Sequence, residues 1–405
     1  MNGEKYSSSG KRGESARSDC YFEIEITSSG GIKLDLKSKV ASLYGNSIRE
    51  LINEMCGFFE LKNAKILCED YGALPFVIAA RFELAVNILF PENEKEFLLP
   101  FNQNNFYTSS KDRLRRSRLY LPGNEPKFFL NAGLHKPDGI ILDLEDSVAP
   151  PEKDAARILV RNTLRSVDFY GSERMVRINQ LPLGLEDLEF VVPNNVHVIL
   201  IPKCESADQV IEVNDQIKRI KHEYNIKNDI FLMPIIESAL GIIKAYEIAS
   251  AVKANCALTI GLEDYTADIG TQRSTEGKES FFARSIIVNA AKANGIQAID
   301  TVFSDVGDME GLKQSIIEAK SLGFEGKGCI HPRQIPVVHK YFEPAREEIE
   351  KAKKIILAFD EAEHKGLGVV SLGSKMIDAP VVKRAQKTIH LAILNDLLKA
   401  DWKEK

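Results

Sequence analysis

GIILDLED, residues 139–146, is a short apolar run that ends in acidic residues. The last three-quarters of the chain holds further runs of this kind, each separated from the next by about a helix and its loops: 117–122, 174–179, 197–203, 230–237, 256–264, 296–302 and 327–332. Short apolar runs without alternation are typical of strands buried on both faces, and their interleaving with helices indicates parallel βαβ units. Eight such units predict an α/β fold, a (β/α)8 TIM barrel over residues 113–335, with an open doubly wound sheet as the alternative.

The overall composition is that of an ordinary soluble protein with more than one core. The chain has 405 residues, of which 44% are hydrophobic and 27% charged. A net charge of −5 and a pI near 5.9 give no general attraction for nucleic acid or a membrane surface. The six cysteines are scattered without a CxxC pair, and no run approaches the roughly 18 apolar residues of a membrane span. With no secretory signal in the sequence, these features predict a cytoplasmic protein without nucleic-acid or membrane partners.

The two ends of the chain differ in character from the barrel region. Residues 1–20 are rich in Ser, Gly and charge, which predicts a flexible arm. Residues 21–92 predict a small α+β domain, in which FEIEI and IKLDL flank a Ser-Gly-Gly turn and indicate a hairpin, followed by two helices around a third strand. Residues 93–112 are polar and without period, which predicts a linker. Residues 336–405 predict a C-terminal helical extension that also serves as an active-site lid.

Acidic residues stand at the C-terminal ends of the predicted barrel strands, where barrel enzymes build their active sites. Glu237 ends the fifth strand and Asp264 ends the sixth, so a closed barrel makes them neighbours. Two carboxylate ligands on rigid strands, with the remaining positions left to water and substrate, are typical of a site for Mg²⁺ or Mn²⁺. No His or Cys lies beside them, which argues against Zn²⁺. For each carboxylate taken singly, a helix cap is the alternative.

Arg177, on the third strand, is expected to point into the same mouth. As a functional residue it would clamp a carboxylate or a developing enolate, because a guanidinium stays charged and planar. As a structural residue it would be the counter-ion of the acidic cluster. His331 precedes a proline at the end of the last strand, and we interpret it as a hydrogen-bonded structural imidazole rather than as a base.

A basic run, KDRLRRSR at residues 111–118, leads into the first barrel strand. A solvated charged face is one interpretation. Taken with Lys153 after the second strand and Lys203 at the end of the fourth, Arg116 better suits a phosphate-bearing cofactor such as CoA or a carrier arm. We therefore predict that Arg116, Lys153, Lys203 and Asn179 bind the substrate or its CoA.

Eight ordered motifs between residues 113 and 398 are similar to the signatures of the citrate lyase β-subunit, malyl-CoA lyase and citramalyl-CoA lyase family: RSRLYLPG, GIILDLEDSVAPPEKDAAR, MVRIN, LIPKCES, IIESALGI, GLEDYTADIG, CIHPRQIPVV and GSKMIDAP. The resemblance implies that Glu237 and Asp264 ligate Mg²⁺. It implies that Arg177 binds substrate oxygens, and that Glu145 is the acidic residue behind the metal-bound waters.

The last of these motifs concerns a group supplied by a neighbouring subunit. In GSKMIDAP the resemblance implies that Asp378 is an acid/base group that reaches into a neighbour's site, although Lys375 is extra relative to the family pattern. The flanking Gly366, Gly368 and Gly373 allow the segment to extend. A homotrimer or a hexamer is therefore expected.

Residues 21–92 resemble the acyl carrier (γ) subunit of citrate lyase, in YGNSIRELINEM and EDYGALPFVIAARFE. The carrier bears a phosphoribosyl-dephospho-CoA arm on a serine within a motif of Gly, Glu-Ser and Ser-Asp. Here GESARSD, residues 13–19, keeps both halves of the motif but separates them by two residues. The resemblance therefore implies attachment at Ser15, with Ser18 as the alternative and an unmodified tail as a third interpretation.

Together these features predict a lyase that cleaves a 3-hydroxy-3-carboxyacyl thioester into a 2-oxo acid and a shorter acyl thioester, with the substrate carried on the arm of its own N-terminal domain. In the implied mechanism a base takes the hydroxyl proton, Arg177 stabilises the thioester enolate, and Asp378 or its water protonates it. The alternatives are a lyase for free acyl-CoA and a non-catalytic carrier or scaffold subunit. The expected partners are the small thioester and an acyltransferase subunit. The choice among citryl, citramalyl and malyl substrates stays open.

Overall fold

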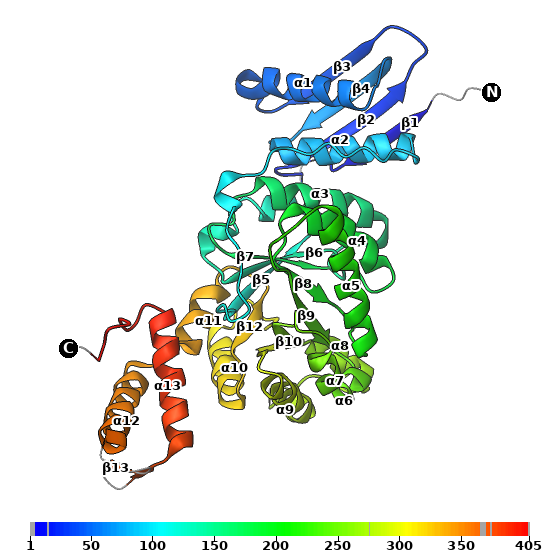
Figure 1. The fold of residues 1–405 in the computed structure, drawn as a ribbon. Helices are drawn as coiled ribbons and strands as arrows, with labels where there is room; N and C mark the ends of the chain where they lie inside the picture. Colours follow the sequence, from blue (N-terminus) through cyan, green and yellow to red (C-terminus); the bar gives the residue numbers. More distant parts are fainter. Residues whose placement is uncertain (1–4, 14–15, 275, 365–369, 373–374, 404–405) are drawn as a thin grey trace.

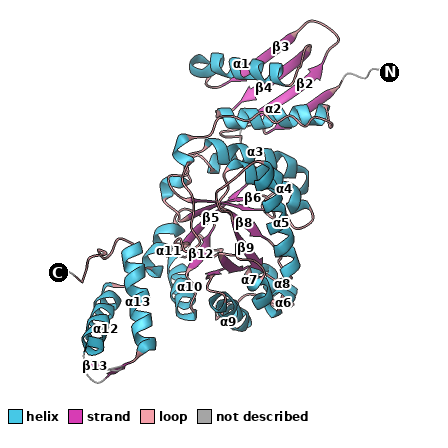
Figure 2. Ribbon diagram, viewed as in Figure 1, coloured by secondary structure: helices cyan, strands magenta, loops and turns pink. Residues whose placement is uncertain are grey.

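The computed structural model describes residues 5–13, 16–274, 276–364, 370–372 and 375–403. Figure 1 shows three parts along the chain: a small N-terminal domain, a barrel, and a pair of C-terminal helices that stand to one side. In Figure 2 the strands of the barrel lie inside a ring of helices. This arrangement confirms the predicted (β/α)8 barrel with a small α+β domain before it.

The barrel is closed by parallel pairing in the order β10-β11-β12-β5-β6-β7-β8-β9. Every predicted barrel strand is present: β5 Ser117–Pro122, β6 Gly139–Asp143, β7 Glu173–Arg177, β8 Val198–Ile201, β9 Phe231–Ile236, β10 Ala257–Ile260, β11 Gln297–Asp300 and β12 Gly326–Cys329. The surrounding helices are α3 Lys153–Ser166, α4 Leu183–Val191, α5 Ala207–Glu223, α6 Ala239–Ile243, α7 Ala245–Ser250, α8 Leu262–Asp268, α9 Lys278–Ala293, α10 Met309–Leu322 and α11 Gln334–Phe342. The open sheet, kept as an alternative, is excluded because each of the eight strands pairs with two neighbours, so the sheet has no edge strand.

Side chains of the barrel strands alternate between two apolar cores. On β5, Leu119 and Leu121 point outward into the layer between strands and helices. Tyr120 packs against the interior core, which is formed by residues such as Ile141 and Met233. Because successive side chains of a strand face opposite sides, Arg118 belongs to the same interior row as Tyr120.

The N-terminal domain is a four-stranded sheet with two helices. Its elements are β1 Tyr6–Gly10, β2 Cys20–Ile26, β3 Ile32–Ser38, α1 Ala41–Phe58, β4 Ala64–Asp70 and α2 Pro75–Leu89. The strand order is β1-β2-β4-β3, so β2 and β3 do not pair and the predicted hairpin is wrong. Instead β4 inserts between them, antiparallel to β2 and parallel to β3, because α1 carries the chain back from β3 in a βαβ crossover.

The predicted flexible arm is also corrected, because residues 6–10 form strand β1 against β2. The segment YSSSG has no large aliphatic residue to pack against α2. Its serines are instead held to α2 by hydrogen bonds. Ser7 Oγ donates to the carbonyl of Ala85 at 2.8 Å, and Ser9 Oγ donates to the carbonyl of Arg81, both on α2. Gly10 closes the strand at φ +90°, where an added Cβ would lie 2.0 Å from the carbonyl oxygen of Cys20. Small side chains let β1 lie close to the helix backbone.

The N-terminal domain shares a core with the barrel. Phe76, Val77 and Ala80 of α2 belong to the same apolar cluster as the outer layer of the barrel, and α2 packs along α3. At this contact the fully buried Arg161 of α3 pairs with Glu83 at 2.8 Å and with Glu96 at 2.8 Å. The two domains are therefore packed as one body.

A second set of contacts ties the domain to the loop that follows β5. Arg81 forms a buried ion pair with Asp19 at 2.8 Å, and its Nη2 also donates to the carbonyl of Asn124 at 3.4 Å. Lys11 forms an ion pair with Glu125. Since β5 ends at Pro122, these contacts place residues 11 and 19 beside the C-terminal end of the barrel.

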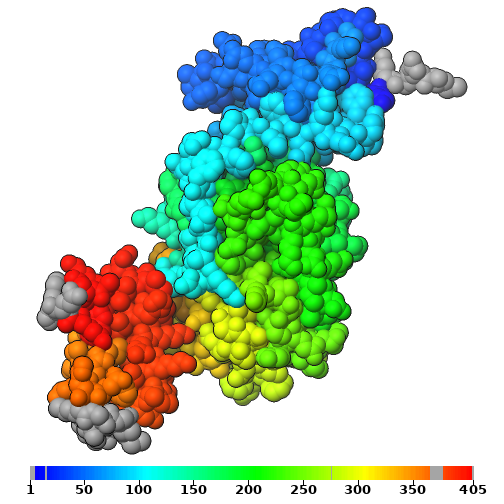
Figure 3. Space-filling model, in the orientation of Figure 1, coloured from blue at the N-terminus to red at the C-terminus, as the bar shows by residue number. Residues whose placement is uncertain are grey.

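Residues 93–112 run along the barrel surface, cyan in Figure 3, and include one short 3-10 helix at Gln103–Asn105. The C-terminal extension consists of α12 Arg346–His364, β13 Val370–Leu372, β14 Lys375–Ile377 and α13 Ala379–Leu394, with an apolar core of its own. No helix in the described part of the chain is long and apolar enough to cross a membrane.

Candidate active site

A cavity of about 470 Å³ lies at the C-terminal end of the barrel. Its wall is built from the ends of several strands and the segments that follow them, which bring together Asp143, Arg177, Glu237 and Asp264. This is the face on which barrel enzymes place their reacting groups. The sequence prediction that these side chains share one mouth is therefore met by the geometry.

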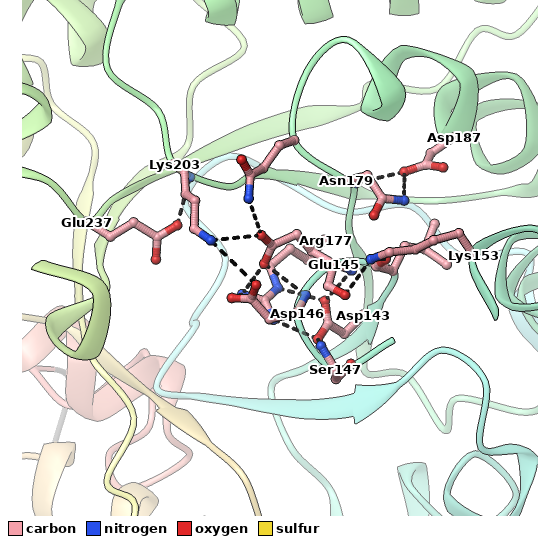
Figure 4. A network of polar contacts seen from close by, with 12 residues as sticks. Asp143, Glu145, Asp146, Ser147, Lys153, Arg177, Asn179, Asp187, Lys203 and Glu237 are labelled. Atoms are coloured by element: carbon pink, nitrogen blue, oxygen red, sulfur yellow. Dashed lines mark hydrogen bonds and ion pairs between the residues drawn. The ribbon is translucent and has the colours of Figure 1, made fainter. Parts of the chain in front are cut away.

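Arg177 and Asp143 form the rigid part of this wall, shown in Figure 4. Arg177 Nε and Nη2 donate to the two carboxylate oxygens of Asp143, each at 2.7 Å. Burial alone would raise the pKa of Asp143, but hydrogen bonds and charge from Arg177 outweigh it and hold that pKa below its ordinary value. Asp143 also accepts from the backbone N–H groups of Glu145 and Ser147. The pair therefore fixes both the guanidinium and the loop after β6.

Glu145 lies in that loop and accepts from three sides. Arg177 Nη1 lies 3.0 Å from its carboxylate, Lys203 Nζ 3.4 Å and Gln180 Nε2 3.0 Å. Lys153, at the start of α3, also holds this loop, because its Nζ donates to the carbonyls of Leu144 and Glu145 at 2.7 and 2.6 Å. Lys153 is thus used to position the loop, and Lys203 is the cation that faces the cavity acids.

Glu237 follows β9 and is 6% exposed. Its Oε1 accepts the backbone N–H of Lys203 at 2.7 Å, which the left-handed φ of +45° at Lys203 turns towards it. Burial, with a contribution from the negative charge of Asp264, raises the pKa of Glu237 to about 8. Gly261 leaves the room for this carboxylate, since an added Cβ would lie 2.4 Å from Glu237 Oε2.

Glu237 and Asp264 suit a divalent cation. They are carboxylates close enough for one to raise the other's pKa, and no ion pair to either occurs within the residues that the structure describes. A dipositive ion would relieve that repulsion, and oxygen-only ligands fit Mg²⁺.

Asp264 is not at a strand end as predicted but in the first turn of α8, because β10 stops at Ile260 and the helix begins at Leu262. Among the described residues, no group of three or more His, Cys, Asp and Glu side chains gathers as a metal site.

Comparison with known proteins assigns the barrel. Residues 116–332 match the family model described as HpcH/HpaI aldolase/citrate lyase, which is more than half of the chain. The chain belongs to the HpcH/HpaI aldolase/citrate lyase family. Residues 9–89 match an ACP model described as malonate decarboxylase delta subunit (MdcD), so the N-terminal domain resembles an acyl carrier protein.

Relatives in this family agree on the class of enzyme. The citrate lyase subunit beta of Leuconostoc mesenteroides subsp. cremoris is 41% identical over 72% of this chain and 98% of its own length. Human mitochondrial citramalyl-CoA lyase is 35% identical over 69% of this chain and 85% of its own. A crystal structure of CitE from Mycobacterium tuberculosis, in complex with magnesium, acetoacetate and coenzyme A, aligns with a TM-score of 0.57 and 31% identity over 70% of this chain and 99% of that one. The aldolase/citrate lyase chain described here is therefore an oxo-acid lyase by class.

Two residues predicted to bind substrate or CoA are placed elsewhere in this family member. Arg116 precedes β5, so it lies at the opposite end of the barrel, where it pairs with Asp138 at 2.9 Å and Glu343 at 2.8 Å. The prediction took entry into the first strand for the active-site mouth, which instead lies beyond Pro122. Asn179 is 4% exposed and its amide donates to Asp187 at 2.9 Å, so its side chain supports the loop after β7.

The wall of the cavity does not include Ser18, His331 or Asp378. Asp378 caps α13, where its carboxylate accepts from the N–H of Val381 at 3.2 Å, in the extension that stands apart from the barrel in Figure 1. Ser15 lies outside the described residues. Ser18 is described, with a left-handed φ of 56°. His331 Nδ1 accepts from the N–H of Arg333 at 3.1 Å, in line with a structural role.

Sequence reasoning missed two features of the site. From the sequence, Arg118 is placed only within the basic run 111–118 and is given no role of its own, although it is fully buried and borders the cavity. Its place in the alternation of β5, two residues before the inward Tyr120, was the available signal. The contact between Lys11 and Glu125 had no sequence signal, because it joins residues of two separate domains.

Proposed function

We propose that this chain cleaves a 3-hydroxyacyl thioester into a 2-oxo acid and a shorter acyl thioester, with Mg²⁺ or Mn²⁺ held by Glu237 and Asp264. The observation that carries the proposal is the buried Glu237, whose pKa is raised to about 8 by burial and by the nearby Asp264. Such a pair is unfavourable alone and favourable around a cation. The relatives named above, citrate lyase and citramalyl-CoA lyase subunits, support the reaction class.

The other residues of the cavity fit this reaction. A bound divalent ion would polarise the substrate hydroxyl and its adjacent carboxylate. Arg177 presents a guanidinium already oriented by Asp143, so it stabilises the charge of the thioester enolate without reorganising. Glu145 and Lys203 contact Arg177 and Glu237 of the cavity wall, and their charges help to orient the substrate oxygens. We assign Asp378 of a neighbouring copy as the group that delivers a proton to the enolate carbon.

The supply of substrate on a covalent arm at Ser15, or at Ser18, is the finer part of the proposal. Its support is the position of the flanking residues. Lys11 pairs with Glu125, and Asp19 is held by Arg81, which also contacts Asn124. Because Lys11 and Asp19 are held beside the loop after β5, an arm attached between them would reach the barrel mouth, and tethering would give its thioester an effective concentration of roughly millimolar.

A homo-oligomer, a trimer or a hexamer, is supported by an exposed apolar surface. Large apolar side chains lie on the helices after β9 and β10, where Ile243 is 80% exposed and Phe282 71%; the others are Leu240, Tyr246, Ile269 and Phe281. Helices α6, α7 and α8 each contact α9, so these side chains share one flank of the barrel. An exposed apolar patch of this kind marks a protein interface.

The test uses the purified full chain and synthetic citryl-, citramalyl- and malyl-CoA. We expect release of a 2-oxo acid from at least one thioester in Mg²⁺ or Mn²⁺, and none in excess EDTA until the metal is restored. Full turnover in EDTA, or no cleavage of any of the three with metal present, would overturn the proposal.

The arm is tested separately by intact-mass measurement of protein from its native host. An adduct of the size of phosphoribosyl-dephospho-CoA on residues 1–20, lost in Ser15→Ala and kept in Ser18→Ala, supports attachment at Ser15. Loss only in Ser18→Ala moves the site to the second serine. The absence of an adduct from the native protein would leave a lyase for free acyl-CoA.

A further inference from the structure

Four arginines of this protein pair with a carboxylate in the same way. In four ion pairs the Nε and Nη2 groups, which form one straight edge of the guanidinium, donate to the two oxygens of one carboxylate: Arg81 with Asp19, Arg115 with Glu173, Arg177 with Asp143, and Arg284 with Asp300. This two-bond geometry is the preferred way for arginine to bind a carboxylate.

Arg118 differs from these four arginines. It is 0% exposed, and its Nη1 donates to Thr259 Oγ1 at 2.9 Å and to the sulfur of Met233 at 3.1 Å. Its Nε and Nη2 have no hydrogen-bond acceptor within the described part of the chain. No carboxylate there forms an ion pair with it. The edge that four other arginines use for a carboxylate therefore lacks a protein partner.

The position of Arg118 connects it to the active site. It borders the same cavity as Glu237, together with Ile235 and Thr259. Ile235 stands two residues before Glu237 and Thr259 two residues before Gly261, so these side chains form the row just beneath the carboxylates. Two residues along a strand correspond to about 7 Å. The guanidinium lies at the floor of the cavity, one row below the proposed cation site.

Another buried arginine shows what a structural solution looks like. Arg174 also has no carboxylate partner among the described residues, and its Nη1 lacks a hydrogen-bond partner. Its Nε and Nη2, however, donate to the carbonyls of Asn195 and Tyr107, and the guanidinium lies 4.4 Å over the ring of Tyr107. It precedes Met175 on β7, near the N-terminal end of the barrel. Arg118 has a hydroxyl and a thioether in place of those carbonyls, and it faces the reaction cavity.

We propose that Arg118 is a specificity-determining residue that binds, through its Nε and Nη2 edge, a second carboxylate of the substrate. This inference rests on the proposed function and narrows it. The substrate carries a carboxymethyl group on the carbon that bears the hydroxyl, and the product is a 2-oxo dicarboxylate. A carboxylate at this floor leaves water completely, which is favourable only where a charged donor meets both oxygens. A substrate with a methyl group in that place leaves the guanidinium unpaired.

The experiment compares two CoA thioesters that differ only at that carbon, one with carboxymethyl and one with methyl. For the wild-type chain we expect kcat/KM to favour the carboxymethyl substrate by about 100-fold or more. Arg118→Met should remove most of that preference, chiefly through KM, and leave the methyl substrate within a few-fold of wild type. Arg118→Lys keeps the charge but lacks the edge, and should also lose the preference. Arg174→Met is the matched control and should keep it.

Binding supplies a readout that does not need turnover. Inhibition by a 2-oxo dicarboxylate should weaken at least about tenfold in Arg118→Met, while inhibition by a 2-oxo monocarboxylate stays unchanged. If chloride or acetate protects the wild type against heat but not Arg118→Met, and the two substrates are not distinguished, the site binds a free anion and the proposal is wrong. Equal preference in wild type and both variants also overturns it. Failure of the wild type to cleave either thioester instead counts against the proposed function.

Discussion

The two ends of the barrel each hold a cavity of about 470 Å³, and they differ in how their charges are matched. At the cavity of the N-terminal end, three cations pair with acids of the protein. Arg115 pairs with Glu173 at 2.8 Å, and Lys292 and Lys387 share Glu325 at 2.6 Å each. At the C-terminal end Glu237 and Asp264 face each other without such a partner, and Arg118 lies beneath them without a carboxylate.

Cavity size therefore does not identify the active site in this protein, whereas unmatched charge does. Unmatched buried charge lowers stability, so it persists where a ligand completes it. Matched charge at the other end fastens the strands, the linker and the C-terminal helices together. Substitutions at either end of the barrel test this difference.

The largest expected effect is at the unmatched acids. Glu237→Gln and Asp264→Asn should each lower kcat/KM by about 10³-fold or more, because the bound ion supplies several kcal/mol of charge stabilisation. The matched control is Glu263→Gln, whose carboxylate already pairs with Arg273 and should be dispensable. Turnover and thermal unfolding are measured together. If Glu263→Gln lost as much activity as Asp264→Asn, the turn of α8 rather than its unmatched acid would be what matters.

The second effect concerns the group that reaches the mouth from another copy. Asp378→Asn should lower kcat by about 10²-fold or more, as for loss of a general acid. An equal mixture of Asp378→Asn and Asp264→Asn chains, unfolded and reassembled together, should regain up to about a quarter of the wild-type activity, because that share of sites combines both intact residues. Native mass spectrometry confirms mixing. Mixed oligomers without activity would exclude donation between copies.

The third effect tests the matched end. Arg115→Met leaves Glu173 buried and unpaired, and should lower the free energy of unfolding by about 3–5 kcal/mol. kcat per folded molecule should stay near wild type, since Arg115 lies at the opposite end of the barrel from the active-site cavity. Arg116→Met, at a partly exposed pair, should cost less. Chemical unfolding and turnover at 20 °C or below separate the two quantities. A large loss of kcat with little change in stability would mean that Arg115 serves catalysis rather than stability, contrary to the role assigned to the N-terminal end.

The smallest effect is a pH dependence at the matched end. Burial, with the charge of Arg174, lowers the pKa of His197 to about 3, whereas the unfolded imidazole titrates near its ordinary 6.5. The unfolded chain therefore binds the extra proton between these values. Stability contributed by neutral His197 is complete above pH 6.5 and is lost as the pH falls towards 3, by at most about 1.4 kcal/mol per pH unit.

Urea unfolding at pH 7.5, 6.5 and 5.5 measures that slope, above the range in which most carboxylates titrate. His197→Gln should flatten it relative to wild type, since the other histidines are common to both chains. An unchanged slope would mean that His197 is protonated in the folded protein.

The barrel was predictable from sequence because each strand is a continuous apolar run followed by a polar end. GIILDLED contains both the apolar run and the polar end, so it predicts strand β6 and the acidic residues of the loop that follows it. β1 was not predictable in this way. YSSSG carries no apolar pattern, and its buried serines acquire meaning only beside the backbone of α2, more than 70 residues away.

The sequence predicts which residues lie at the C-terminal end of the barrel, but it does not predict which of them form ion pairs with one another. Glu237 and Arg177 could be placed from strand order alone. Arg116 and Arg118 stand two residues apart in one basic run, yet one is held by Asp138 and the other has no carboxylate partner among the described residues. Which arginine finds an acid depends on strands far apart in the chain.

The shared core between α2 and α3 has a consequence for how such a gene can change. Phe76, Val77 and Ala80 are covered by the barrel and not by their own domain. A break in the gene between residues 92 and 112 would yield two products, each with an uncovered apolar face. Separate subunits could arise from this ancestor only after those faces became polar or bound one another tightly. Fusion of the two domains is therefore easier to acquire in evolution than to reverse.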